Sequence, residues 1–127
     1  MEKKVVLIGA GDDALFWSLM FHLGDFKTET IAVKNGNEMI AELGNRISVN
    51  EVIFISIDRA DEELVRCMQR SGQERESRII TVTSLADHAL ESAVREAGIF
   101  YYMTVPNEIQ RVRKIAMCAL RTNEKTV

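Results

Sequence analysis

The stretch Val52-Ile53-Phe54-Ile55-Ser56-Ile57-Asp58 sets five apolar residues around one serine and closes on an aspartate. A short, β-branched apolar run of this kind is typical of a central strand that is buried on both faces. In an open α/β sheet, ligands bind beyond the carboxyl ends of the strands. We therefore expect any chemistry of this chain near Ser56 and Asp58, although no catalytic set accompanies them.

Four more short apolar runs flank this strand, and amphipathic helical patterns separate them. The other expected strands cover 5–8, 28–33, 78–83 and 99–105. The expected helices follow Asp12-Asp13 to about residue 23, and cover about 37–43, 61–70, 87–97 and 107–121. This strict strand–helix alternation predicts an α/β domain with a five-stranded parallel sheet and helices on both faces.

The length of 127 residues fits one domain with a real core, which we place at residues 1–121, with 122–127 as a polar tail or the start of a linker. Hydrophobic content of 46% and charged content of 28% are typical of a soluble globular protein. The net charge of −3 does not suit nucleic-acid binding, which needs a basic stripe. No apolar run reaches membrane-spanning length and no segment resembles a signal peptide, so we expect a cytoplasmic protein.

The residues that commonly bind metals are scattered. Cys67 and Cys118 each lie in an expected helix and outside any CxxC pattern, so we interpret both as buried thiols in a reducing compartment. His22 and His88 are isolated and lack ligand spacing. The sequence therefore predicts no metal site and no cofactor.

Four motifs occur in a characteristic order: Asn35-Gly36 after the second expected strand, Thr83-Ser84 at the end of the fourth, Glu96-Ala97-Gly98 after the fourth helix, and Tyr102-Met103-Thr104-Val105-Pro106 on the fifth strand. With these motifs the chain resembles the CheY-like receiver domain of two-component response regulators over nearly its whole length. The resemblance implies a flavodoxin-like, doubly wound sheet of order 2-1-3-4-5 with five helices, and a role in signal transduction or a phosphorelay.

The resemblance also implies a phosphorylation pocket, and most of its positions are changed here. Receivers accept a phosphoryl group on an aspartate at the end of the third strand. That aspartate holds Mg²⁺ with an acidic pair after the first strand, and a lysine on the fifth strand assists. In this chain Ser56 replaces the phosphoacceptor aspartate, and Val105 replaces the lysine. The acidic pair should fall within Gly9, Ala10 and Gly11, none of which has a carboxylate. Thr83 keeps the Thr or Ser that receivers have at the end of the fourth strand. Because Mg²⁺ needs hard oxygen ligands and the phosphoryl charge needs neutralising, we expect a pseudo-receiver without enzymatic activity.

One alternative is a working phospho-receiver. Asp58 lies two residues beyond Ser56, so strand alternation would point both side chains the same way. With Asp12 or Asp13, Asp58 could rebuild an acidic Mg²⁺ site and act as the phosphoacceptor.

A second alternative is a small Rossmann-like nucleotide-binding domain. Gly9-Ala10-Gly11-Asp12-Asp13-Ala14 matches the pattern G-x-G-x-x-G/A directly after a strand. Gly9 and Gly11 would then bring a pyrophosphate to a helix N-terminus, although the two aspartates would repel it.

Trp17 and Phe21 lie one helical turn apart, roughly opposite the apolar stripe of the first helix. An exposed aromatic pair marks a partner site, unless other segments cover it or the stripe is merely wide. The resemblance also implies pairing through the fourth helix, the fifth strand and the last helix, so we add Tyr102 on that strand and Arg111 on the last helix. Opposite charges on these two helices suit a symmetric contact, but they equally suit plain solvated faces. The leading hypothesis is a regulatory module that binds a protein partner or its own copy without phosphorylation.

Overall fold

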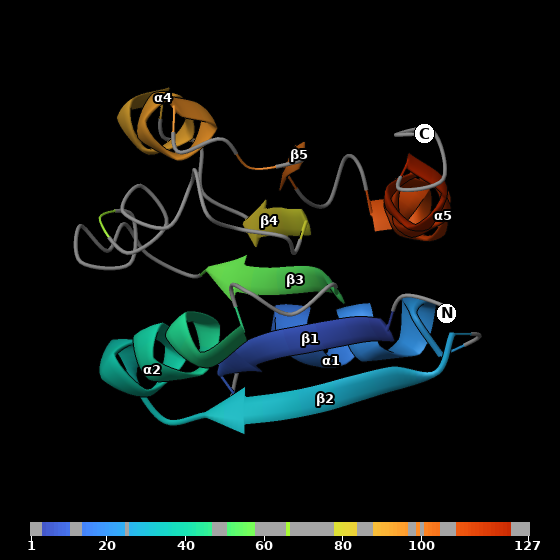
Figure 1. Cartoon of the computed structure of the whole chain (residues 1–127), viewed down its shortest axis with the longest axis horizontal. Coiled ribbons are helices and arrows are strands. Elements are labelled where there is room, and N and C mark those ends of the chain that lie inside the picture. The colour runs from blue at the N-terminus through green and yellow to red at the C-terminus, as the bar shows by residue number, and fades with distance from the viewer. Residues whose placement is uncertain are drawn as a thin grey trace.

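The computed structural model describes residues 4–10, 14–24, 26–46, 51–57, 66, 78–83, 88–96, 99, 101–104 and 109–122. The strands are β1 (Lys4–Ala10), β2 (Thr28–Val33), β3 (Glu51–Ile57), β4 (Arg78–Thr83) and β5 (Tyr101–Thr104). The helices in these ranges are α1 (Ala14–His22), α2 (Gly36–Arg46), α4 (His88–Glu96) and α5 (Val112–Thr122), and the 3-10 turn η1 (Ile109–Arg111) precedes α5 (Figure 1). The expected helix at 61–70 lies outside the described residues, apart from Arg66, which is helical.

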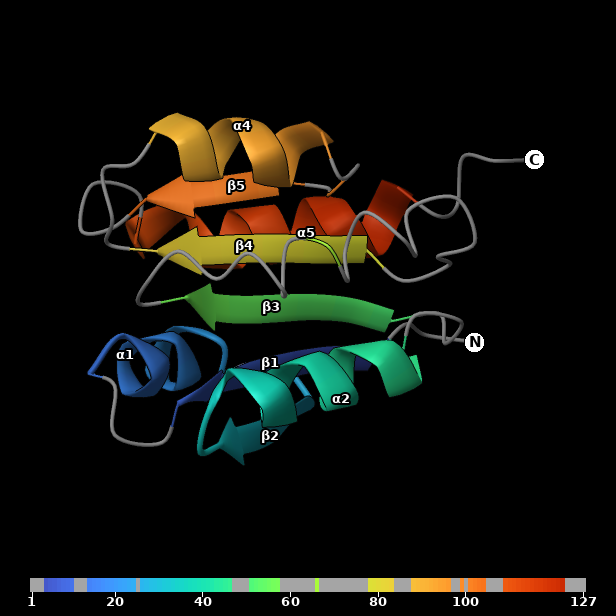
Figure 2. The same ribbon diagram turned by 90° about the vertical axis from the view of Figure 1, so that its left-hand side faces the viewer.

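The five strands form one parallel sheet in the order β2-β1-β3-β4-β5, as Figure 2 shows. This arrangement confirms the predicted doubly wound, flavodoxin-like fold. The predicted bounds of β2 and β4 match the structure, whereas Ile99, the predicted start of the fifth strand, lies outside β5. No helix in the described ranges is long and apolar enough to cross a bilayer.

Two apolar layers sandwich the sheet because side chains along a strand alternate between its faces. On one face, α1 and α5 pack on residues such as Leu7 and Phe54. On the other, α2 and α4 pack on residues such as Ile8 and Ile53. In Figure 1, α2 and α4 lie to the left of the strands and α5 to the right. The central strand β3 is buried from residue 51 to 56, which confirms the prediction of a strand covered on both faces.

Helix α2 begins at a side-chain cap. The backbone N–H of Glu38 donates to Asn35 Oδ1 at 2.9 Å, and the Glu38 carboxylate accepts from the backbone N–H of Lys34 at 3.1 Å. The first bond satisfies a backbone N–H that the first turn of a helix leaves without a partner, and the second satisfies the N–H of the residue before the cap. Asn35-Gly36, which the sequence marks as a turn, is therefore also the start of the helix.

Candidate functional site

The carboxyl ends of β1 and β3 meet at Gly9 and Ser56. A Cβ placed on Gly9 would lie 2.4 Å from Phe16 Cδ1 and 3.1 Å from Ser56 Cβ. Phe16 belongs to α1 and is 1% exposed, and Ser56 is 3% exposed. Since a 2.4 Å contact is far inside van der Waals distance, glycine is required at position 9 by close packing.

This packing leaves no room for a carboxylate at position 9, one of the positions where the resemblance places acidic residues. The ring of Phe16 occupies the adjoining space and offers no oxygen ligand to Mg²⁺. Within the described strands, the only carboxylates belong to Glu29 and Glu51, which lie near the opposite, amino ends of β2 and β3. No group of three potential metal ligands occurs in the parts of the chain that the structure describes.

The remaining expected pocket residues are only partly brought together. Thr83 is fully buried at the end of β4 and pairs in register with Ile57 and Thr104. Ser56 pairs with Val82, which packs in the α1/α5 layer, so strand alternation directs Thr83 to the other face. Ala10 ends β1 and is half-buried. Gly11, Val105, Asp58, Asp12 and Asp13 lie outside the described residues.

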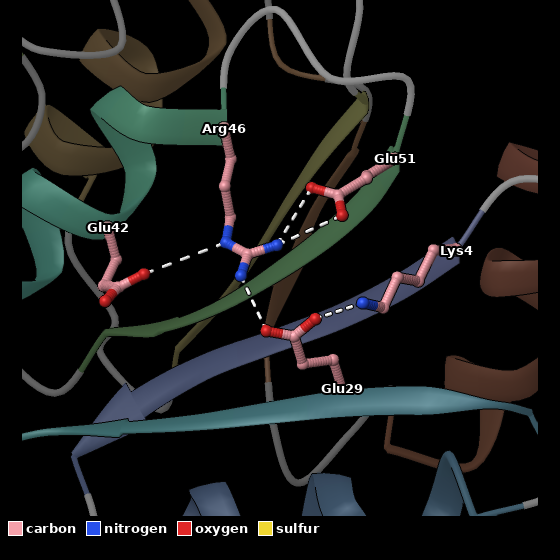
Figure 3. Close-up of polar contacts among 5 residues, drawn as sticks. All are labelled: Lys4, Glu29, Glu42, Arg46 and Glu51. Atoms are coloured by element: carbon pink, nitrogen blue, oxygen red, sulfur yellow. Dashed lines mark hydrogen bonds and ion pairs between the residues drawn. The ribbon is translucent and has the colours of Figure 1, made fainter.

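A group of charged side chains lies near the amino ends of β1, β2 and β3. We call it the Arg46 cluster (Lys4, Glu29, Glu42, Arg46 and Glu51; Figure 3). Arg46 Nη1 donates to both oxygens of Glu51, at 3.2 and 3.1 Å, and Nη2 donates to Glu29 Oε2 at 2.6 Å. Lys4 pairs with the other oxygen of Glu29, and Glu42 Oε2 lies 3.8 Å from Arg46 Nε. The cluster ties the end of α2 to β1, β2 and β3.

The ionisation of the Arg46 cluster follows from these contacts. The hydrogen bond from Lys4 holds the pKa of Glu29 below its ordinary value, with partial burial working against it and the charge of Arg46 adding to it. Burial alone would lower the pKa of Arg46, but hydrogen bonds and charges from Glu51 and Glu29 outweigh it and raise that pKa. Both groups are therefore held in their charged forms and joined to partners, which suits a structural role.

Sequence reasoning missed the Arg46 cluster, although two signals pointed to it. Glu42 and Arg46 have the i, i+4 spacing of a helical ion pair. Glu51 directly precedes an apolar run that the sequence predicts to be a buried strand, so its charge would need a partner, and the structure leaves Glu51 only 4% exposed.

The expected partner-contact residues divide into exposed and buried ones. Trp17 is 56% exposed and Phe21 is 83% exposed, so both rings project from α1 as predicted. Arg111 is also exposed. Tyr102, however, is 3% exposed and packs in the α2/α4 layer, with the Arg95 guanidinium 5.8 Å from its ring centre. Tyr102 therefore lies in the core and not on the predicted partner surface, because the alternation of β5 turns its ring inward.

Helix α5 differs from expectation at Cys118 and exposes one large apolar residue. Cys118 is exposed, whereas the sequence predicted a buried thiol; residues 112, 115, 116 and 119 of the same helix face the core instead. Met117 is 41% exposed and was not singled out from the sequence. Cys67 lies outside the described residues.

No protein-family model and no curated protein sequence matches the chain. Its structure is similar to several solved ones. A CheY-like receiver domain protein from Methanospirillum hungatei JF-1 has a TM-score of 0.71 at 21% identity, over 98% of this chain and 99% of that one. A signal receiver domain of a histidine kinase from Clostridium thermocellum has a TM-score of 0.73 at 14% identity, over 95% and 99%.

A different kind of protein shares the same architecture. The pilus assembly protein CpaE from Caulobacter crescentus CB15 has a TM-score of 0.62 at 14% identity, over 91% of this chain and 93% of that one. At such low identities the likeness concerns the fold. Strand order, layer arrangement and these neighbours together show that the chain has the fold of a CheY-like response-regulator receiver domain.

Proposed function

We propose that this chain is a signalling module of the receiver type that acts by binding another protein and does not transfer phosphoryl groups. The observation that carries the proposal is the contact of Gly9 with Phe16 and Ser56. At the carboxyl ends of β1 and β3, where receivers hold Mg²⁺ and the phosphoacceptor, this chain packs an aromatic ring, a glycine and a buried hydroxyl.

Phosphoryl transfer depends on positioning and on neutralising charge at the phosphoryl oxygens. A buried serine is a weak nucleophile unless a base lies beside it. Gly9 has no side chain and the side chain of Phe16 is a hydrocarbon ring, so neither side chain can supply a base or a metal ligand. The local chemistry therefore favours a domain that has kept the fold and works through its surface.

The structural neighbours are compatible with this reading. Some are named as receiver domains of two-component signalling, and others as pilus assembly proteins. One architecture thus occurs in proteins with different assignments, so function must be argued from the site and the surface.

Nucleotide binding is less well supported. Gly9 is buried within β1 and lies against Phe16, so its backbone is not open to a pyrophosphate. Gly9, the first glycine of this pattern, is better explained by close packing of α1 on β1.

The proposal is tested by thermal unfolding with and without Mg²⁺ and beryllofluoride, a mimic of an aspartyl phosphate. We expect no change in Tm, because no intact acidic pocket would hold the mimic. A ligand at 100 times its Kd would stabilise the domain by about 2.7 kcal/mol, which corresponds to a rise of roughly 10 °C. An ordinary receiver treated in the same way serves as the positive control.

A rise in Tm that needs both Mg²⁺ and beryllofluoride would overturn the proposal in favour of the phospho-receiver. The variant Asp58→Asn would then locate the acceptor, because it should abolish that rise if Asp58 is phosphorylated. A parallel melt with a dinucleotide tests the other alternative, and we expect no shift.

A further inference from the structure

The large apolar side chains that the structure leaves exposed all lie on one helical layer. Among the described residues these are Trp17 and Phe21 on α1 and Met117 on α5. The two helices contact each other and pack on the same face of the sheet. The helices α2 and α4, on the other face, have no such exposed residue in their described parts. Apolar exposure concentrated in this way marks an interaction surface.

The aromatic rings on α1 are well placed to anchor a partner. Trp17 and Phe21 lie at i and i+4 on the exposed side, where neighbouring side chains align along the helix. Trp17 makes an edge-to-face contact with the buried ring of Phe16 at 5.9 Å, and Phe21 makes one with His22 at 5.6 Å. Rings supported by neighbours lose little freedom on binding, and aromatic residues dominate binding energy at interfaces.

Charge distinguishes this layer from the rest of the chain. From residue 109 to 122 the sequence has Arg111, Arg113, Lys114 and Arg121 and no acidic residue, and from 14 to 24 it has neither Asp nor Glu. Arg113 and Lys114 are both exposed. Because consecutive residues of a helix are about 100° apart around its axis, these two side chains lie on different sides of the exposed face of α5. The whole chain has a net charge of −3, so this layer is the cationic part of an anionic protein.

The exposed apolar residues and the cations beside them together indicate which kind of partner would bind this layer. A second copy using the same surface would bring the cations of both α5 helices to one contact, and like charges oppose association. An amphipathic helix can lay its i, i+3, i+4 and i+7 apolar residues over Trp17, Phe21 and Met117. Carboxylates along its edges would then face Arg113 and Lys114.

We infer that the α1–α5 face (Trp17, Phe21, Arg113, Lys114 and Met117) binds an acidic amphipathic helix of a partner protein. The inference rests on the proposed function and names its class of partner. Apolar contact supplies the affinity, and the charges set the specificity and the salt dependence.

A display library of 16-residue amphipathic helices tests the inference directly. The apolar positions are fixed and the flanking positions vary among Glu, Gln and Lys. Selection uses the whole chain, with counter-selection against Phe21→Ala. We expect enriched peptides to carry Glu at the flanking positions. Enrichment of Lys, no charge preference, or no enrichment over the Phe21→Ala protein would each overturn the inference.

Trp17 provides the affinity measurement, because it is the only tryptophan in the chain and lies within the α1–α5 face. We expect a selected Glu-flanked peptide to shift its emission to the blue. Phe21→Ala should weaken binding at least tenfold. Arg113→Glu/Lys114→Glu should weaken the Glu-flanked peptide similarly and strengthen its Lys-flanked counterpart. Lys34→Glu, an exposed charge reversal at the end of β2, is the matched control and should leave binding unchanged.

Sedimentation separates a protein partner from a second copy. If Trp17 emission changed with protein concentration in the absence of peptide, and a dimer sedimented, then a second copy would occupy the face and the inference would be wrong. Failure of the proposed function has a different signature, since it requires a Tm rise with Mg²⁺ and beryllofluoride. The two ideas can therefore fail separately. Melting temperatures of each variant confirm that it is folded.

Discussion

The amino ends and the carboxyl ends of the described strands are packed by different kinds of contact. At the amino ends of the strands, Arg46 and Glu51 bring charge into a nearly buried site and satisfy it with hydrogen bonds at 3.1 and 3.2 Å. At the carboxyl ends, Gly9 and Ser56 meet beneath the ring of Phe16. One end is held by ion pairing, and the other by close contact between small and aromatic groups.

Among the described residues, this difference is the opposite of the usual arrangement in an open α/β sheet, where polar side chains at the carboxyl ends carry the chemistry. Here the carboxylates of the described strands lie near the amino ends and are engaged by Lys4 and Arg46. They hold α2 to three strands. Among the described residues, ion pairing therefore holds the amino ends of the strands, and close packing fills the carboxyl ends of β1 and β3.

The largest expected effect comes from breaking the charged end. Arg46→Met leaves Glu51, which is 4% exposed, without its cation. Breaking a buried ion pair by removing one partner costs about 3 kcal/mol. We expect a loss of that size in the free energy of unfolding, measured by urea denaturation.

The control for this variant is Arg46→Met/Glu51→Met, which removes both charges. Replacing a buried ion pair by apolar residues of similar size is often neutral, so the double variant should regain most of the lost stability. A double variant as unstable as Arg46→Met would show that the loss arises from the contacts of Arg46 with Glu29 and Glu42 and not from an unpaired Glu51.

The next largest effect concerns the packed end. In Gly9→Ala the new methyl group would collide with the Phe16 ring, and overpacking of a core costs about 1–3 kcal/mol. We expect a destabilisation of about 2 kcal/mol by urea denaturation. A Gly9→Ala protein as stable as the wild type would mean that Phe16 moves aside freely, and the packing argument for a lost pocket would fail.

Gly44→Ala is the matched control and has the opposite expected sign. Gly44 is exposed within α2, and a Cβ there meets nothing within 4 Å. Alanine in a helix is favoured over glycine by roughly 0.5–1 kcal/mol. The same substitution should therefore stabilise the protein by about that amount.

The smallest effect is the dependence on pH. The pKa of Glu29 is lowered in the folded protein, so its contribution to stability is present above the ordinary glutamate pKa and is lost as pH falls through the lowered value. Glu29→Gln should make stability less sensitive to pH in this acidic range. Because Glu29 is about one-third exposed, we expect a change on the order of 0.5 kcal/mol. An acid unfolding curve of unchanged slope would assign the dependence to other carboxylates.

Local pattern alone was enough to predict much of this protein. Strand–helix alternation gave the parallel sheet, and the resemblance gave its order. The spacing of Trp17 and Phe21 predicted that both rings point away from the core. Such features depend on the repeat of the backbone, 3.6 residues in a helix and two in a strand, which can be read over a few neighbouring positions.

Tertiary structure decided the features that join distant segments. The Arg46 cluster combines residues from β1, β2, α2 and β3, and the Gly9 contact needs α1 laid across the end of β1. Tyr102 belongs to the core because the register of β5 on β4 sets which face it takes. A sequence pattern records which side chains share a face of one element. Which atoms then meet across elements depends on register, crossing and packing, and these arise only when the whole chain has folded.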